Sequence, residues 1–268
     1  MLRAISPISA CALALILLCS TRTAFAYRPF NGTDGDVAER GEFELELGPV
    51  QMLRVNGRNF LLTPATVLNL GIFPRTELVV DFVGNIPLRP DMGEARYQLR
   101  DTDVFLKFLL REGVLQEETG PSIALEAGPL TPEIAGERGF GAAANLIVSE
   151  RWGWFVAHLN NELVLGRKTL AAAWSNSLIT EFRFSETAWP VAELLWEREL
   201  RSGASIYSIL AGMIWSVSEG LDLDAAVVVA SVEGNPSYEG RLGFTWAVPF
   251  WEPSNQQPSE DQERNAHE

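Results

Sequence analysis

The chain has 268 residues, of which 35 are acidic and 21 are lysine or arginine, so its formal net charge at pH 7 is −14. An acidic surplus of this size disfavours nucleic acid as a partner, because the phosphate backbone is itself anionic. The two cysteines, Cys11 and Cys19, both lie in the amino-terminal export signal described next. The exported chain is therefore expected to form no disulfide and no thiolate metal site.

A cleaved export signal is indicated over residues 1–26. It has a basic start at Arg3, a short apolar run, and a small-x-small sequence at residues 24–26. These are the three parts of a secretory signal, and the apolar run is too short to anchor a chain in a bilayer. The mature chain is expected to begin at Tyr27. Loss of Arg3 and Arg22 makes its charge two units more negative than −14.

The mature chain shows the hydrophobic period of strands rather than of helices. No stretch after residue 26 approaches the about 20 apolar residues that a membrane-spanning helix needs. Instead, apolar residues alternate with polar or small ones over segments of about ten residues, the length of a tilted strand that crosses a membrane. In residues 241–250 one face consists of Leu242, Phe244, Trp246, Val248 and Phe250.

This pattern predicts an all-β protein, a transmembrane antiparallel up-and-down β-barrel of about 12 strands. The expected strands are 42–54, 60–72, 76–86, 98–110, 121–129, 139–149, 153–165, 170–183, 190–200, 204–217, 221–232 and 239–250. Pro64 cannot donate a ladder hydrogen bond, so it predicts a bulge or an irregular stretch in the second strand.

Short polar turns and longer loops alternate between these strands. Short turns are expected at residues 73–75, 149–151, 185–187 and 218–220, with a longer one near 116–118, and the longer Gly- or Pro-rich loops at 84–96, 129–138 and 233–238. In outer-membrane barrels the periplasmic turns are tight and the outer loops are longer. Because twelve strands return the chain to the side on which it started, both termini are expected on the periplasmic side. An aromatic belt at that interface is expected from Trp152, Trp154, Trp189, Trp215, Trp246 and Trp251.

A soluble β domain would show the same alternation with its two faces exchanged. Soluble surfaces usually carry many lysines, whereas Lys107 and Lys168 are the only lysines here. Charged residues outside the strands also concentrate in the turns and loops. These two features favour the membrane barrel over a soluble periplasmic β domain.

The expected organisation has four parts. They are the export signal over residues 1–26, an N-terminal periplasmic segment over 27–41, the barrel over 42–250 and an acidic tail over 251–268. The tail is rich in acids, proline and glutamine, so we expect it to be solvated and disordered.

Several short stretches are shared with one known family. They are Arg28-Pro29-Phe30, Thr33-Asp34-Gly35, Gly41 to Glu46, Asp101-Thr102-Asp103 followed by Lys107, Gly120-Pro121-Ser122, His158-Leu159-Asn160 and Leu221 to Asp224. In these stretches the chain resembles the outer-membrane "transporter" family named for the meta-pathway of phenol degradation. The resemblance implies an outer-membrane location and the passage of small or apolar compounds, without defined catalytic residues.

If the apolar strand faces meet lipid, the opposite faces line a charged lumen. The residues expected there are Glu44, Glu46, Glu77, Asp81, Asp103, Lys107, Glu126, His158, Glu162, Glu181, Arg183, Glu193, Glu197 and Glu199. Carboxylates raise the local cation concentration, so one interpretation is a narrow pore that prefers cations or zwitterions. The other is a network of paired acids and bases that plugs a small barrel.

Enzymatic alternatives have weaker support in the sequence. A lipid-acting barrel enzyme would need His158 on the lipid-facing surface, whereas the alternation places it in the lumen. Glu193, Glu197 and Glu199 could suggest the paired acids of a glycosidase, but on a strand they share one wall and lack an open cleft. We therefore expect no catalytic residue, no cofactor and no metal site.

Together these features predict an exported outer-membrane protein of a Gram-negative bacterium. It is expected to be a passive channel or transporter for small molecules, including aromatic or hydrophobic ones. A non-transporting barrel with a plugged lumen and a lipid-acting enzyme are the alternatives. The expected partners are outer-membrane lipids, the barrel-assembly machinery during insertion and an unidentified small solute, but not nucleic acid.

Overall fold

The computed structural model describes residues 28–250, so the expected export signal and acidic tail lie outside the described residues. The strands are β1 (Glu42–Val55), β2 (Arg58–Phe73), β3 (Thr76–Pro87), β4 (Gln98–Arg111), β5 (Ser122–Leu130), β6 (Gly141–Trp152), β7 (Phe155–Leu165), β8 (Ala172–Phe182), β9 (Ala188–Glu199), β10 (Ser205–Ser218), β11 (Leu221–Val232) and β12 (Asn235–Pro249). Each strand end lies within four residues of its predicted position. The predicted all-β class is confirmed.

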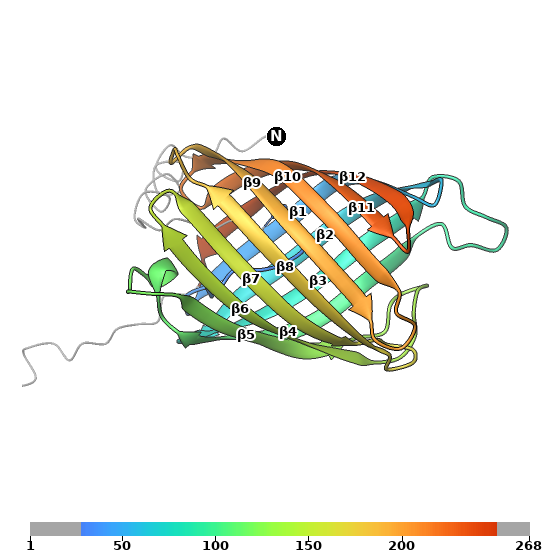
Figure 1. Ribbon diagram of the computed structural model, residues 1–268, viewed down its shortest axis with the longest axis horizontal. Coiled ribbons are helices and arrows are strands. Elements are labelled where there is room, and N and C mark those ends of the chain that lie inside the picture. Colours follow the sequence, from blue (N-terminus) through green and yellow to red (C-terminus); the bar gives the residue numbers. More distant parts are fainter. Residues whose placement is uncertain (1–27, 251–268) are drawn as a thin grey trace, which may run out of the picture.

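The strands form one closed barrel in which each pairs antiparallel with its neighbours in sequence, and β1 pairs with β12. Closure places Glu42 opposite Pro249 and Val55 opposite Ser237. Figure 1 shows the strands running obliquely around the barrel. Since every strand has two neighbours, the sheet has no unpaired edge, which is the condition for β-structure in a bilayer.

The two ends of the barrel differ. One end, here called the terminal end, holds the start of β1 and the finish of β12, together with the connections at residues 74–75, 112–121, 153–154, 183–187 and 219–220. The 3-10 helix η1 (Val114–Gln116) lies in the second of these. The opposite end, the loop end, holds the connections at residues 56–57, 88–97, 131–140, 166–171, 200–204 and 233–234. In Figure 1 the β3–β4 loop extends far from the loop end.

The prediction of a longer loop at residues 233–238 was wrong, because β11 ends at Val232 and β12 begins at Asn235. The connection is the two-residue turn Glu233-Gly234, with φ of 51° and 83°. Positive φ at both central residues is the requirement of a tight hairpin turn whose twist matches the flanking strands. Asn235 and Pro236 read as loop residues in the sequence, but pairing with β11 includes them in β12, where proline is tolerated at a strand start.

The polarity of the barrel is inverted relative to a soluble protein. On β9, Leu194 is 54% exposed on the outside, whereas the neighbouring Glu193 is 1% exposed on the inside. On β11, Val227 is 60% exposed and Val228 only 6%. Apolar side chains cover the outer wall, and buried acids, amides and hydroxyls cover much of the inner wall. This distribution suits lipid outside and water inside, and it defines a transmembrane barrel.

Two finer predictions have different outcomes. Pro64 does coincide with a bulge, because the β2–β3 register shifts between Leu62 and Ala65. Trp189, however, does not belong to the aromatic belt: it is buried inside the barrel and its Nε1 donates to Glu181. Its position after a turn resembled that of the belt residues, but its place in the alternation of β9 directs it inward.

The other described tryptophans near the terminal end face outward. Trp152, Trp154, Trp215 and Trp246 are all exposed. Trp154 packs on Phe184 with ring centroids 4.6 Å apart, which joins the β6–β7 and β8–β9 turns in one aromatic patch. Amphipathic rings at the ends of strands suit a membrane–water interface. Trp251 lies outside the described residues.

Within residues 28–250 there is no helix with the length and apolar character needed to cross a bilayer.

Candidate functional site

Residues 28–38, here called the lumen segment, run inside the barrel. This corrects the expectation of a separate periplasmic segment over residues 27–41. The backbone of the segment donates to side chains of four strands, at Glu193, Asn160, Ser149 and Glu77. Those acceptors are buried polar groups of the inner wall, and a chain without regular structure supplies the N–H donors that they need.

Glu193 holds the first part of the segment. Its Oε2 accepts from the backbone N and the Nδ2 of Asn31 at 2.9 and 2.8 Å, and its Oε1 accepts from the backbone N of Gly32 at 2.8 Å. One step further, the backbone N of Thr33 donates to Asn160 Oδ1 at 2.9 Å, while Asn160 Nδ2 donates back to the Thr33 carbonyl at 2.8 Å. Hydrogen bonds to a carboxylate, such as those accepted by Glu193, are among the stronger ones.

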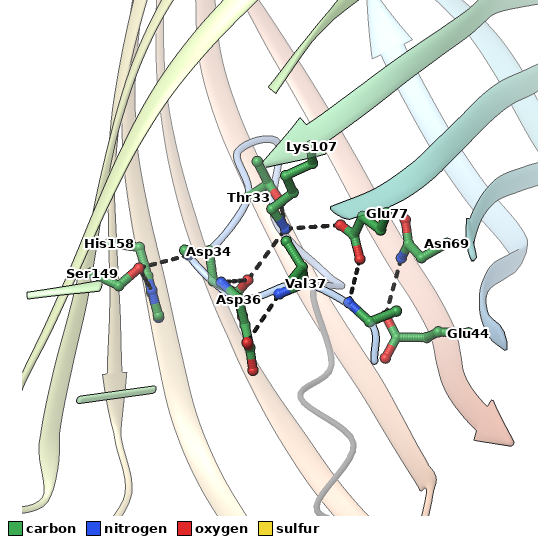
Figure 2. Close-up of polar contacts among 12 residues, drawn as sticks. Thr33, Asp34, Asp36, Val37, Glu44, Asn69, Glu77, Lys107, Ser149 and His158 are labelled. Atoms are coloured by element: carbon green, nitrogen blue, oxygen red, sulfur yellow. Dashed lines mark hydrogen bonds and ion pairs between the residues drawn. The ribbon is translucent and has the colours of Figure 1, made fainter. Parts of the chain in front are cut away.

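Lys107 of β4 ties the middle of the segment to the wall. Its Nζ lies 3.2 Å from Glu77 Oε1, 3.5 Å from Asp34 Oδ1 and 3.3 Å from Thr33 Oγ1. The second oxygen of Glu77 accepts from the backbone N of Ala38 at 2.5 Å. Figure 2 shows the segment between Lys107 and Glu77 on one side and Ser149 and His158 on the other. A buried ammonium therefore compensates carboxylates of both the wall and the segment.

On the opposite wall, Ser149, His158 and Glu181 form a hydrogen-bonded chain. The backbone N of Gly35 donates to Ser149 Oγ at 2.8 Å, Ser149 Oγ lies 2.8 Å from His158 Nδ1, and His158 Nε2 lies 3.0 Å from Glu181 Oε1. Since a carboxylate only accepts, Nε2 carries the proton, and in the neutral ring Nδ1 then accepts from the serine hydroxyl. The chain thus ends on the lumen segment and faces away from lipid.

The start of the segment is held by two arginines. Arg28 Nε lies 3.3 Å from Asp224 Oδ2 on β11, and Arg241 Nη1 donates to the Pro29 carbonyl at 2.7 Å. Between them Phe30 packs on an inward-facing apolar cluster of Trp189, Val191, Leu210, Ile214, Ala226 and Val228. The segment is therefore seated by apolar burial at one point and by polar contacts at others.

Two glycines allow the close approach of the segment to the wall. A Cβ at Gly32 would lie 2.4 Å from Ser177 Oγ and 3.1 Å from the Asn160 side chain. A Cβ at Gly35 would lie 3.0 Å from Ser149 Oγ and 3.1 Å from the Ser122 carbonyl. Larger residues at either position would push the backbone away from its acceptors.

Burial and a neighbouring charge raise the pKa of one acid of the lumen segment, Asp36. The pKa of Asp36 is raised from 3.8 to about 7, chiefly by burial and then by the negative charge of Asp34, against a hydrogen bond from Gln116. That bond, from Gln116 Nε2 to Asp36 Oδ1, is 2.7 Å long. Asp36 therefore changes its charge near neutral pH, whereas a free aspartate does so near 4.

Beside the segment the lumen contains a cavity of about 650 Å³. Thirteen acidic and four basic residues line it, together with apolar and hydroxyl side chains. The lining includes these residues that the sequence placed in the lumen: Glu44, Glu46, Glu77, Asp81, Asp103, Lys107, Glu126, Glu162 and Glu197. The structure therefore brings most of the predicted lumen residues to one space.

The remaining predicted lumen residues lie elsewhere. His158, Glu181 and Glu193 are buried and engaged as described above. Arg183 follows β8, contacts Glu181 at 2.8 Å and lies over the Trp189 ring. Glu199 ends β9 at the loop end, where it accepts from Ser202 at 2.6 Å. These five residues do not line the cavity.

The sequence by itself did not reveal the lumen segment, its partners Asn160 and Arg241, or the wall-side residues Asn69 and Arg167. Asn69 Nδ2 donates to Glu44 and Glu46 at 3.1 and 2.9 Å, and Arg167 pairs with Asp103. The signal available was the inward parity of the two asparagines, which matched that of the acids. The clustering of glycine and short polar residues over residues 31–36 was a second signal.

Among the described residues, no group of three or more His, Cys, Asp or Glu side chains is arranged to hold a metal ion.

An inverted, closed barrel with a charged lumen defines the class to which the protein belongs, that of transmembrane β-barrels. No protein-family model matches the sequence, and no curated protein does. Among solved structures the chain is similar to an outer-membrane channel from Pseudomonas putida F1, with a TM-score of 0.53 and 10% identity over 82% of this chain and 100% of that one. It is also similar to the KdgM porin, with a TM-score of 0.48 and 10% identity over 76% of this chain and 98% of that one. At such identity the likeness concerns the fold.

Proposed function

We propose that the protein is an outer-membrane channel that passively admits small molecules through an acidic lumen narrowed by residues 28–38. The observation that carries the proposal is the inverted barrel with a cavity of about 650 Å³ inside it. A barrel that served only as an anchor would need no such space lined by charge. The export signal expected over residues 1–26 supports the outer-membrane location.

The lining supports a preference for cations. Acids outnumber bases thirteen to four around the cavity, and low-dielectric walls focus the field of like charges into the space between them. The lumen segment crosses the same space, so the width available to a solute depends on how firmly that segment is seated.

The family resemblance belongs to the same proposal. Residues that carry it, among them Arg28, Thr33, Asp34, Lys107 and Asn160, come from separate parts of the chain and meet around the lumen segment. A shared pattern of this kind supports membership of the phenol meta-pathway transporter family and passage of small, including apolar, compounds.

The test is the ion conductance of the mature protein in a planar bilayer, using only material whose gel mobility shifts on heating. Discrete current steps with a reversal potential that favours K⁺ over Cl⁻ are the expected result. A folded, heat-modifiable barrel that conducts nothing would contradict the proposal.

That silent outcome would favour the second candidate, a barrel plugged by its own segment. The observation in its favour is the set of buried contacts from the segment to opposite walls, at Glu193, Lys107 and Ser149. Removing residues 28–38 separates the two cases, because a plugged barrel would begin to conduct only after the deletion.

A lipid-acting enzyme has less support, since Ser149 and His158 are buried on the lumen side. Phospholipid turnover by the reconstituted protein, compared with its His158→Ala variant, tests this alternative directly. Turnover that is lost in the variant would restore it.

A further inference from the structure

The lumen wall contains a row of directly paired residues that crosses seven strands, from β3 to β9. Its members are Glu77, Lys107, Glu126, Asn145, Glu162, Ser175 and Glu197. Glu77 lies at the terminal end of β3, whereas Glu197 lies near the loop end of β9. Because the strands are tilted, the row climbs around the lumen from one end toward the other.

Acids occupy every second strand of this row. Neighbouring strands are about 4.8 Å apart, so successive carboxylates are about 10 Å apart. Glu77 is paired with Lys107. Among residues 28–250, by contrast, no hydrogen bond and no ion pair within 4.0 Å engages the carboxylates of Glu126, Glu162 or Glu197, although all three line the cavity.

A second row runs beside the first on β3 to β8, two residues nearer the loop end of each strand and hence on the same face; on β9 the corresponding residue is the acid Glu199, which pairs with Ala173. It is apolar, and its members are Val79, Phe105, Gly128, Ala143, Val164 and Ala173. Val79, Phe105 and Ala143 pack with Leu130 into one buried cluster, against which Val67 and Val164 also pack. Two residues along a strand span about 6.6 Å, so Glu77, Glu126 and Glu162 each lie close to the apolar row.

We propose that the two rows together bind organic cations that carry an apolar group, and that such ions are the preferred solutes of the channel. The ammonium group would contact Glu126 or Glu162 while its apolar body covers the row at Phe105 and Val164. The inference rests on the proposed channel function and narrows its solute class.

The chemistry of the two rows decides against simpler solutes. A metal cation gains nothing from the apolar row, and a neutral aromatic molecule leaves the carboxylates unpaired. Only a solute with both features uses both rows.

The experiment compares two ammonium ions of similar size under bi-ionic conditions with K⁺. Benzylammonium has an apolar body, whereas tris(hydroxymethyl)methylammonium has a polar one. From reversal potentials we expect benzylammonium to be more permeant by at least about threefold, since the apolar row removes part of its ring from water.

Two variants assign the effect to the rows. Val79→Thr with Val164→Thr keeps the side-chain shapes and should bring the ratio of the two ammonium ions toward one without changing the preference for K⁺ over Cl⁻. Glu162→Gln with Glu197→Gln should lower the permeability of all three cations relative to Cl⁻. Ala143→Ser replaces the threonine pair if that variant does not fold.

The outcomes separate this inference from the channel proposal. Equal permeability of the two ammonium ions through a K⁺-selective channel overturns the inference alone, as does an unchanged ratio in the threonine or Ala143→Ser variant. A folded barrel without conductance overturns both.

Discussion

At the residue scale, Lys107 is the side chain on which the lumen most depends. It is a buried ammonium within 3.5 Å of carboxylates from the wall and from the lumen segment. Removing one partner of a buried charge group leaves the others uncompensated, which costs more than the pair itself contributed. The seating of the lumen segment is therefore sensitive to this one position.

Replacing Lys107 by Met should loosen the segment and raise the mean single-channel current several-fold. Glu77 and Asp34 would then repel each other across the space left by the ammonium. Single-channel recording checks the current, and limited proteolysis near residues 28–38 checks the release. Lys168→Met is the matched control, because the other lysine lies exposed in the β7–β8 connection. Identical currents in the two variants would show that Lys107 does not hold the segment.

Asp36 predicts a dependence on pH. Its pKa is about 7 when the segment is seated and near 4 when the segment is free, so the seated state binds the proton more tightly. The stabilisation of the seated state is complete below about pH 4 and is lost as pH rises through about 7. Current should therefore increase between pH 5 and pH 8. The Asp36→Asn variant should show a clearly smaller change over that range, and an equal change in both proteins would assign it to other groups.

At the element scale, β9 shows how one strand serves two surroundings. Glu193 is buried beneath the lumen segment, Leu194 faces outward, and Glu197 lines the cavity. Alternation alone assigns both acids to the lumen, but it does not distinguish an acid that holds the segment from an acid that faces solute.

Glu193→Gln and Glu197→Gln should therefore have different effects. Glu193→Gln removes the charge that accepts from Asn31 and Gly32, so it should release the segment and increase current. Glu197→Gln should leave the current amplitude close to that of the parent and reduce the preference for K⁺ over Cl⁻. Reversal potential and conductance, measured on both variants, make the comparison. The same phenotype from both would mean that the two acids share one role.

The outward position of Leu194 predicts a cost for charge. Leu194→Arg should destabilise the folded barrel by about 2–4 kcal/mol if the site lies near the bilayer midplane. Urea titration of the protein refolded in lipid vesicles, read by heat-modifiable gel mobility, measures it. Leu200→Arg, just beyond β9 and also exposed, should cost about 0–1 kcal/mol because it lies near the interface. Equal costs would place the bilayer differently along the strand.

At the scale of the whole molecule, selectivity depends on the summed field of the lumen rather than on one acid. Thirteen acids and four bases surround the cavity, and water in the lumen carries screening ions. The Debye length falls from about 10 Å at 0.1 M salt to about 3 Å at 1 M. The spacing between successive acids of the climbing row, about 10 Å, matches the Debye length at 0.1 M and is about three times the Debye length at 1 M.

The preference for K⁺ over Cl⁻ should therefore weaken strongly between 0.1 M and 1 M KCl. Reversal potentials under a constant tenfold gradient, measured at several mean concentrations, test this. Selectivity that does not change with salt would point instead to a narrow constriction in which ions lose their water.

Much of the barrel follows from the sequence by itself. Polar and apolar residues alternate along segments of about ten residues, and this period of two indicates a strand rather than a helix. The alternation also states which side chains share a face, as for Glu193 on the inner face of β9 and Leu194 on its outer face. The number of strands, their approximate ends, the bulge at Pro64 and the inward direction of the charged residues all follow from such local patterns.

The tertiary structure alone decided what fills the lumen. Residues 28–38 have no periodicity, and their partners Glu193, Asn160 and Lys107 lie 162, 127 and 74 residues away along the chain. Inward parity and the glycine-rich composition of residues 31–36 mark both stretches as unusual, but neither stretch alone states which distant groups bond to each other. The pairing of Glu126, Asn145 and Glu162 across strands, and hence the climbing row of acids, likewise arises only when the strands are set in register. A local pattern reports which face a residue occupies, whereas its neighbours on that face depend on the closure of the whole barrel.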